Sequence, residues 1–337
     1  MTIMTADPKQ THVAEQWKHG APLITCRFDR SGDLAFSSGQ DYTLQRWSLS
    51  TGECVSWPAH ESWIRDLAFL TDNRTFVSAG CDDSIVFWPT TGDKPEPIRT
   101  VKAHDGWVRT VDASSNGQWL ATGGNDKRVK LWKTDGTFVR EFEGHDSDVY
   151  CCLFHPTDEN VLLSGDLSGT IHQWEISTGK LLRSLDAKEL HTYNGGQQVH
   201  YGGVRSIAIS PDGKQLAAVG LHKATNPLGA VNEPLVVTFD WATGKKQKSH
   251  VAEGVKGIGW RVAYLADGSF VCMSGGSGGG FLIFWKANEE KAFHKLKLPD
   301  TARAMDLHGD GVRLATAHFD GHLRVSKMAP KAMPKKS

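Results

Sequence analysis

The sequence lacks an excess of charge of either sign. Its 337 residues include 38 Lys and Arg and 38 Asp and Glu, so the formal net charge is zero when histidine is neutral. A chain balanced in this way has no general electrostatic attraction to nucleic acid or to an anionic membrane. We therefore expect neither as a partner.

Long apolar runs and paired cysteines are also lacking. No apolar stretch approaches the roughly 18 residues that cross a bilayer, and the opening MTIMTADPKQ has no apolar core of a signal peptide. The six cysteines include no CxxC pair, and several fall on expected inner strands, where a thiol behaves as a small apolar residue. These features predict a cytoplasmic protein with reduced, structural cysteines.

No motif indicates a catalytic or metal site. The run 274–280 satisfies GxSxG at Ser277, but that hydrolase pattern requires a strand–turn–helix context, whereas here it separates two expected strands. No Lys-Ser or Lys-Thr follows the glycines, which excludes a P-loop. His318 and His322 are four residues apart but flank an expected turn, without an accompanying set of Cys or carboxylate residues. We expect no enzyme activity, no metal and no cofactor.

A pattern with a period of about 40 residues is present instead, with no helical signal inside it. It is clearest between His104 and Trp132, where two short apolar runs are separated by a turn at Asn116-Gly117. The same pattern fits residues 19–47, 60–88 and 145–174. A fixed period of this length is the signature of a repeat architecture.

Four residue types keep fixed offsets in three of these segments: a His, a Ser or Thr, an Asp and a Trp. The sets are His19, Ser37, Asp41 and Trp47; His60, Ser78, Asp82 and Trp88; and His104, Thr122, Asp126 and Trp132. The segments resemble WD repeats. The resemblance implies an all-β propeller in which each repeat supplies four antiparallel strands of one blade, and in which each set forms a buried hydrogen-bonded chain.

The pattern extends over most of the chain as seven repeats, which predicts seven blades. The repeats are residues 19–47, 60–88, 104–132, 145–174, 200–239, 255–285 and 298–326. Repeat four has Ser168 at the Asp position, and repeat six ends at Trp285 without a matching His. Repeat seven keeps Thr316 and Asp320 but has Ser326 at the Trp position.

Repeat five needs a choice between two aromatic residues. It begins at His200, and Ala218 replaces its Ser or Thr. Thr243-Gly244 should follow the terminal aromatic by about four residues, as the equivalent turns do in repeats one and four. We therefore place Phe239, and not Trp241, at the Trp position.

The two ends of the chain complete the assignment. In the family that the repeats resemble, the sequence repeat is offset by one strand from the blade, so the N-terminal segment completes the last blade. Residues 12–17 are the expected closing strand, and closure removes the free sheet edges. A propeller at residues 11–326 would then lie between a loose segment at 1–10 and a disordered basic tail at 327–337.

Positions three and five after the repeat His begin the inner strand, near the top mouth of the channel. Side chains two apart on a strand point the same way, so each pair should face one surface. These positions hold Trp63, Arg65, Trp107, Arg109, Asp148, Tyr150 and Arg205, and by offset Trp260 and Arg303. Arg interleaved with Trp and Tyr is typical of protein-binding hot spots, and Arg also binds carboxylates and phosphates. The alternative is that Val-Arg-Ser merely begins a WD inner strand with a solvated Arg.

Two insertions of about ten residues each, at 186–200 and 221–234, should emerge on the same top rim. Long loops on a rigid scaffold often carry binding sites. The resemblance implies an interaction scaffold, a monomeric propeller within a larger complex, that binds a protein or peptide on its top face. The alternative is an enzyme or small-ligand receptor that uses the channel mouth and these two loops. A deep pocket with convergent ionisable groups would favour the alternative, and a broad open surface would favour the scaffold.

Overall fold

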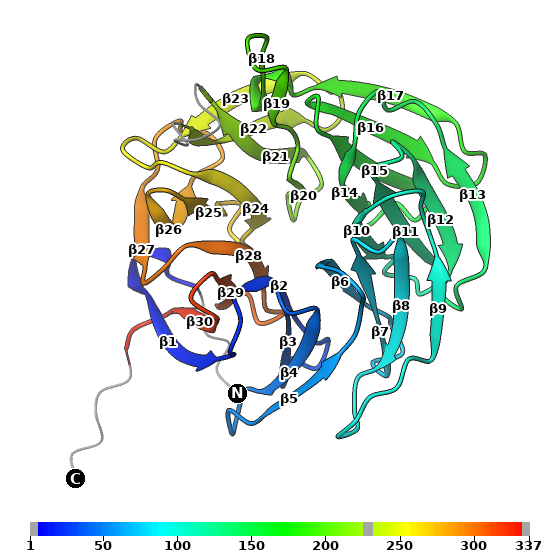
Figure 1. Cartoon of the computed structure of the whole chain (residues 1–337). Helices are drawn as coiled ribbons and strands as arrows, with labels where there is room; N and C mark the ends of the chain where they lie inside the picture. Colours follow the sequence, from blue (N-terminus) through cyan, green and yellow to red (C-terminus); the bar gives the residue numbers. More distant parts are fainter. Residues whose placement is uncertain (1–5, 225–231, 332–337) are drawn as a thin grey trace.

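The computed structural model describes residues 6–224 and 232–331. Seven four-stranded antiparallel sheets are arranged in a ring, and one edge strand of each sheet lies nearest the ring axis (Figure 1). The described residues contain no α-helix and two short 3-10 turns, η1 (Pro8–Gln10) and η2 (Lys188–Leu190). The prediction of a seven-bladed β-propeller is confirmed.

Each of the first six blades is built from four consecutive strands, numbered from the inside of the ring outward. Blade one contains β2 (Leu23–Phe28), β3 (Leu34–Gly39), β4 (Thr43–Ser48) and β5 (Cys54–Pro58). Blade two contains β6 (Ile64–Phe69), β7 (Thr75–Gly80), β8 (Ser84–Pro89) and β9 (Arg99–Lys102). Blade three contains β10 (Val108–Ala113), β11 (Trp119–Gly124), β12 (Val129–Lys133) and β13 (Phe138–Phe142).

The second half of the ring follows the same order. Blade four contains β14 (Val149–Phe154), β15 (Val161–Asp166), β16 (Thr170–Glu175) and β17 (Leu181–Asp186). Blade five contains β20 (Ser206–Ile209), β21 (Gln215–His222), β22 (Glu233–Asp240) and β23 (Lys246–Val251). Blade six contains β24 (Ile258–Tyr264), β25 (Phe270–Gly276), β26 (Gly279–Trp285) and β27 (His294–Leu298). Between blades four and five, β18 (His191–Asn194) and β19 (Val199–Gly202) form a separate hairpin.

Blade seven joins the two ends of the chain. It contains β28 (Ala302–Leu307), β29 (Arg313–His318) and β30 (His322–Met328), and its outer strand is β1 (Thr11–Lys18). The pairing of β1 with β30 runs from Thr11 opposite Met328 to Lys18 opposite His322. The N-terminal closing strand is therefore confirmed. β30 extends two residues past residue 326 because Met328 is fully buried against the same core. Residues 1–5 and 332–337 lie outside the described part.

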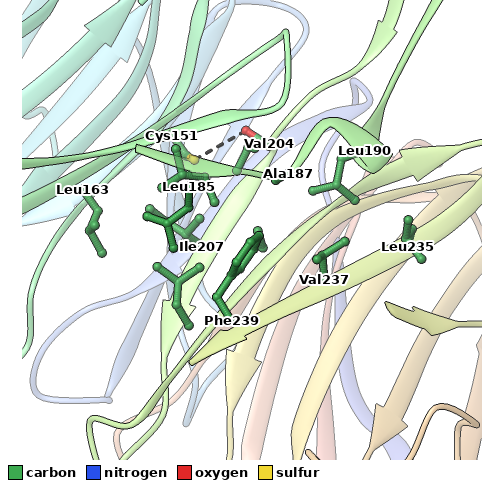
Figure 2. Close-up of a cluster of buried hydrophobic side chains, with 13 residues drawn as sticks. Cys151, Leu163, Leu185, Ala187, Leu190, Val204, Ile207, Leu235, Val237 and Phe239 are labelled. Carbon is green, nitrogen blue, oxygen red and sulfur yellow. Dashed lines mark hydrogen bonds between the residues drawn. The ribbon is translucent and has the colours of Figure 1, made fainter. Parts of the chain in front are cut away.

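The hydrophobic core lies between neighbouring blades. Between blades four and five, Leu163 and Leu185 pack with Ile207, Val237 and Phe239 (Figure 2). The other clusters are built in the same way, from apolar residues that alternate along the strands of two adjacent sheets. Burying one such side chain contributes about 1.5–3 kcal/mol, so each blade is stabilised by both of its neighbours.

The strand register settles the choice of terminal aromatic in repeat five. Trp132 lies opposite Leu120 and Trp174 opposite Leu162, at the middle of each blade. Phe239 lies opposite Leu216 in the same position and is fully buried. Ser326 lies opposite Leu314, which is again the Trp position. The structure thus places Phe239 and Ser326 at the positions that the turn spacing indicated.

The buried polar set forms a continuous chain in blade two. Trp88 Nε1 donates to Ser78 Oγ (2.9 Å), Ser78 Oγ lies 2.7 Å from His60 Nε2, and His60 Nδ1 lies 2.9 Å from Asp82. In blade three, Trp132, Thr122, His104 and Asp126 are connected in the same order. Each link satisfies a group that would be costly to bury unpaired.

Blade one connects its four residues differently. Trp47 Nε1 donates to Ser37 Oγ (2.9 Å), but Ser37 Oγ donates to Gln45 Oε1 (2.8 Å) and not to the His. His19 Nε2 lies 2.8 Å from Asp41. The Gln45 side chain therefore separates the two halves of the set, and the single four-residue chain expected in blade one is not formed.

Blade four has a complete set, so the prediction that Ser168 leaves it without a carboxylate is wrong. His145 Nδ1 lies 2.9 Å from Asp166 Oδ2, and His145 Nε2 lies 2.7 Å from Ser164 Oγ. Asp166 occupies the strand position that is Gly124 in blade three, where a Cβ would lie 2.6 Å from the His ring. The carboxylate thus comes from two residues earlier in the chain.

This geometry predicts how two substitutions in blade four differ. Asp166→Ala removes the acceptor of His145 and should lower the free energy of unfolding by about 1–3 kcal/mol, as Asp82→Ala should in blade two. Ser168→Ala removes only a hydroxyl that donates to Asp166 (2.8 Å) and should cost clearly less. Urea denaturation of the variants measures both. Equal losses at positions 166 and 168 would contradict the assignment.

Blade five does not contain the histidine expected for it, and blade seven obtains its histidine from another position. The expected repeat His of blade five, His200, lies in the β18–β19 hairpin, exposed and 2.9 Å from His191, so its assignment to the blade is wrong. In blade seven, His318 Nε2 lies 2.8 Å from Thr316 Oγ1, and Nδ1 donates to the Asp300 carbonyl (3.0 Å). His318 is therefore a buried structural residue.

Candidate binding site at the mouth of the ring

One residue from each blade faces the ring axis where the inner strands begin, at the end of the ring that we call the top face. These residues are Ile24, Arg65, Arg109, Tyr150, Arg205, Trp260 and Arg303, and all of them line one cavity of about 250 Å³. We call it the mouth cavity. All seven occupy position five after the repeat His or its equivalent; six of them were expected from the sequence, and the seventh, Ile24, lies five residues after His19.

A β-bulge places most of these side chains. The pairing of the first two strands skips one residue in six blades, and the skipped residue is the cavity-lining one. In blade five, Arg205 directly precedes β20 and donates its N–H to the Val219 carbonyl (2.8 Å). A bulged residue is unpaired and its side chain is re-aimed. The ring of lining residues is therefore a consequence of backbone geometry that recurs in six of the seven blades.

Arginine and aromatic side chains alternate along one side of the mouth cavity. The Arg109 guanidinium lies 4.8 Å from the ring centre of Trp107 and 4.6 Å from that of Tyr150. The Arg205 guanidinium lies 4.1 Å from Tyr150 and 5.4 Å from Trp260. Each cation–π contact contributes about 0.5–1 kcal/mol or more when desolvated. The five side chains form one continuous stack from Trp107 to Trp260.

The arginines differ in their polar partners. Arg109 Nε donates to Asn125 Oδ1 (2.6 Å), and its Nη2 lies 3.4 Å from Asp148 Oδ2. Within the described chain, no carboxylate lies within ion-pair distance of Arg65, Arg205 or Arg303. Arg205 Nε is buried and has no hydrogen-bond partner among the described residues. Three guanidinium groups therefore face the mouth cavity without a countercharge.

The environment of these arginines disfavours their charged form. Burial and the neighbouring Arg109 and Arg205 lower the pKa of Arg65 to about 10. Burial also lowers the pKa of Arg205 and of Arg303. A pKa of about 10 still leaves Arg65 protonated at neutral pH. The mouth cavity is therefore strongly positive.

Asp66 on β6 is the one carboxylate in the cavity lining, and two arginines already neutralise its charge. Asp66 Oδ1 pairs with Arg261 Nη2 (2.7 Å) and with Arg27, while its Oδ2 accepts from Thr110 Oγ1 (3.1 Å). A buried carboxylate between two arginines is stable only with such additional hydrogen bonds. This network forms the floor of the mouth cavity.

Four segments of the chain match a known family of repeat proteins. The profile described as "WD domain, G-beta repeat" matches residues 52–89, 95–133, 136–175 and 188–223, which extend from the outer strand of blade one to the second strand of blade five. The structure shows seven such blades in a closed ring. The chain belongs to the WD-repeat family.

Three relatives of this WD-repeat protein illustrate the range of the match. Human pre-mRNA-processing factor 17 is 26% identical over 298 residues, which is 87% of this chain and 47% of the relative. Nuclear distribution protein nudF of Emericella nidulans is 28% identical over 196 residues, 51% of this chain and 44% of the relative. Apoptotic protease-activating factor 1 of Rattus norvegicus is 30% identical over 202 residues, which is 60% of this chain and 16% of the relative. The chain spans less than half the length of each. WD-repeat proteins generally act as non-catalytic interaction scaffolds in complexes.

The residues at position three do not line the mouth cavity of the WD-repeat protein. Trp63 and Trp107 are 37% and 40% exposed and lie on the top face beside the cavity. Their carbonyl groups accept from Cys81 N–H and Asn125 N–H, which fixes the backbone just before the inner strand. Trp107 nevertheless lies against the Arg109 guanidinium (4.8 Å), so both residues of this pair lie at the top face although only position five lines the cavity. Asp148 touches the site only through its ion pair with Arg109.

The two insertions also lie away from the mouth cavity. None of their described residues lines it. The first forms η2 and the β18–β19 hairpin, which packs against β21 outside the ring of inner strands (Figure 1). The second extends the β21–β22 hairpin, where Glu233 pairs with Lys223 (3.3 Å) and Lys256 (2.7 Å), and its residues 225–231 lie outside the described part. The pocket of the alternative function is thus not built from the described parts of these loops.

Sequence reasoning missed a pair of aspartates below the mouth cavity. Asp112 Oδ2 accepts from Phe154 N–H of the next blade (2.8 Å), and Asp306 Oδ2 accepts from Phe28 N–H (2.8 Å). Both face a second cavity of about 210 Å³, which shares Asp66 and Arg261 with the mouth cavity. The only signal was an Asp at the fifth position of an inner strand. These bonds connect the inner strands of neighbouring blades.

Asp112 gives the protein a pH-dependent stability. Burial raises the pKa of Asp112 to about 7, whereas an unfolded Asp has a pKa of about 3.9. The folded state therefore binds more protons between pH 4 and 7, and this contribution to stability falls as the pH rises through that window. Asp112→Asn keeps an acceptor for Phe154 N–H but carries no charge.

We expect Asp112→Asn to match the original protein near pH 4.5 and to be about 1–2 kcal/mol more stable at pH 8. The pKa difference corresponds to at most about 4 kcal/mol, and the half-buried position of the side chain reduces the gain. Urea denaturation at the two pH values measures the difference between the proteins, so titration of all other groups cancels. If the substitution changes the free energy of unfolding by the same amount at both pH values, the role of this carboxyl is contradicted.

The remaining motifs have structural roles. Ser277 lies in the tight turn between β25 and β26, so its GxSxG match has no strand–turn–helix context. In the described part of the chain, His, Cys, Asp and Glu side chains nowhere gather in a group of three or more that could hold a metal ion. No helix among the described residues is long and apolar enough to span a membrane.

Proposed function

We propose that this WD-repeat protein is a non-catalytic interaction scaffold that binds a peptide or protein on its top face, around the mouth cavity. The observation that carries the proposal is the stack of alternating arginine and aromatic side chains from Trp107 to Trp260, next to arginines without a countercharge. Trp, Tyr and Arg dominate the energetics of protein interfaces. The residues are held in place before the partner arrives, which lowers the entropic cost of binding.

The half-exposed tryptophans extend this surface beyond the cavity. Trp63 and Trp107 flank its opening and offer apolar area to a partner at 37% and 40% exposure. A cavity in which a partner's side chain is buried, surrounded by a rim that excludes water, is the usual form of a hot spot. The enzyme alternative has less support, because Asp66, the carboxylate of the cavity, is neutralised by Arg27 and Arg261.

We further propose a monomeric propeller that acts within a larger assembly in the cytoplasm. All six cysteines lie in the described part of the chain and are free thiols, five of them buried, which suits a reducing compartment. Pairing of β1 with β30 covers the edge of β30 and gives blade seven the same four strands as the other blades.

Affinity purification from the native cell tests the proposal. The tagged protein and its Trp63→Ala/Trp107→Ala double variant are compared by quantitative mass spectrometry, with Lys180→Glu on the opposite face as the control. The proposal expects partners that are retained by the control and lost from the double variant. Partners lost only from the Lys180→Glu protein would overturn it.

A further inference from the structure

We propose that the mouth cavity binds the phosphate group of a phosphorylated side chain in the partner, with Arg65, Arg205 and Arg303 as its ligands. The inference rests on the proposed function of the top face and identifies the chemistry of the bound partner. It starts from a local excess of positive charge at this place in a chain of zero formal net charge.

Assigning the ion pairs of the cavity shows how many arginines remain unpaired and available to a ligand. Five arginines and one aspartate line the mouth cavity, an excess of four positive charges. The aspartate, Asp66, is held by Arg261 and by Arg27 below, and Arg109 has Asp148 as its partner. Arg65, Arg205 and Arg303 remain. Their mutual repulsion is unfavourable in the free protein, and an anion in the cavity would relieve it.

The remaining arginines are oriented with their donors available. The faces of Arg205 are covered by Tyr150 and Trp260, and Arg303 lies over Phe319 at 5.2 Å. Stacking on a ring leaves the N–H edge of a guanidinium free, and that edge matches the oxygens of a phosphate. The buried Arg205 Nε without a partner is one such donor.

Valence and size favour a phosphate group over a carboxylate. A phosphorylated side chain carries about −1.5 to −2 charges and three acceptor oxygens near neutral pH, which suits three guanidinium groups. A carboxylate would neutralise only one of them. The cavity of about 250 Å³ admits a single side chain, and the balanced overall charge offers no extended track for a polynucleotide.

The direct test uses the full chain and three small probes: N-acetyl-phosphoserine methylamide, N-acetyl-aspartate methylamide and inorganic phosphate. Binding is titrated by calorimetry at low ionic strength. The phosphoserine probe should bind saturably and more tightly than the aspartate probe. Equal affinity for the two, or no saturable binding of the phosphoserine probe, would overturn the proposal. Binding of inorganic phosphate without the phosphoserine probe would show a site for a free anion and would also overturn it.

Two substitutions locate the site. Arg65→Gln should weaken the phosphoserine probe about tenfold or more. Arg65 has no ion pair or stacked ring in the described chain, so its loss should leave the melting temperature of the free protein unchanged or raise it, because a repelling charge is removed. The control is Arg74→Gln, an exposed arginine on the opposite face, which should bind the probe normally. Equal losses in both variants would contradict the assignment.

Phosphatase treatment of the cell extract separates this inference from the proposed function. If partners are captured through Trp107 and are lost after phosphatase treatment, both stand. If capture needs Trp107 but is insensitive to phosphatase and to the phosphoserine probe at about 100 times the dissociation constant found in the titration, the phosphate site fails and the top-face function stands. If capture does not need Trp107, the proposed function fails, and the titration above still decides whether the cavity binds phosphate.

Discussion

Truncation of Trp107 or Arg109 to alanine is expected to weaken binding of the partner about thirtyfold. Trp107 presents 40% of its surface on the top face and lies against Arg109, which links it to Tyr150 and the rest of the stack. Loss of an anchor of this kind typically costs about 2 kcal/mol or more, or about thirtyfold in affinity. The measurement is the dissociation constant of one identified partner for each variant.

The stability of the variants makes the result interpretable. Trp107→Ala should leave the melting temperature nearly unchanged because the side chain is half-exposed. Arg109→Ala also loses contacts with Asn125 and Asp148 and should lower it slightly. Lys180→Glu reverses an exposed charge on the opposite face and should bind normally. If Lys180→Glu loses the partner while the other two retain it, the top-face assignment is wrong.

The repeat pattern predicted the fold well because turns and strand lengths fix the register. The distance from Thr243-Gly244 back to Phe239 was enough to place an aromatic that differs from the expected Trp. The closing strand followed from the offset between repeat and blade, and β1 pairs with β30 over its whole length. Seven blades could therefore be counted, although the family profile matches only four segments.

The polar sets were harder to predict because a hydrogen bond depends on where an atom lies and not on which residue carries it. In blade four, Asp166 delivers a carboxylate from the position of a glycine. In blade seven, His318 delivers the imidazole from the equivalent position on β29. The sequence offsets of a regular repeat contain no signal for either replacement, because the side chain reaches the same space from another backbone position.

The candidate site was predicted in composition but not in geometry. Position five of each repeat was identified from the sequence, and six of those residues line the mouth cavity. The β-bulge that turns them inward, and that leaves Trp63 and Trp107 outside, has no residue signature in this chain. Phe319, the ring beneath Arg303, was not identified either, because it lies in a turn of another part of the blade.

Phe239→Ala is expected to have the largest effect on stability of any single substitution considered. Phe239 is fully buried between blades four and five, in contact with the cluster that contains Leu163, Ile207 and Val237 (Figure 2). Truncation of a buried Phe removes its transfer free energy and leaves a cavity, at a cost of about 3–5 kcal/mol. Urea denaturation measures this loss as the difference in unfolding free energy between the two proteins. The comparison assumes that this free energy depends on urea concentration with the same slope in both.

The matched control is Trp241→Ala, two residues later. Trp241 is the larger side chain but is only half-buried, and it packs against His155 (4.7 Å between ring centres) and the Arg183 guanidinium (4.8 Å) at the edge of the same two blades. Loss of such exposed contacts should cost about 1 kcal/mol. A larger loss for Trp241→Ala than for Phe239→Ala would mean that Trp241 is the structural aromatic of blade five. The strand register would then have to shift by two residues, and Leu216 would lose its partner across the blade.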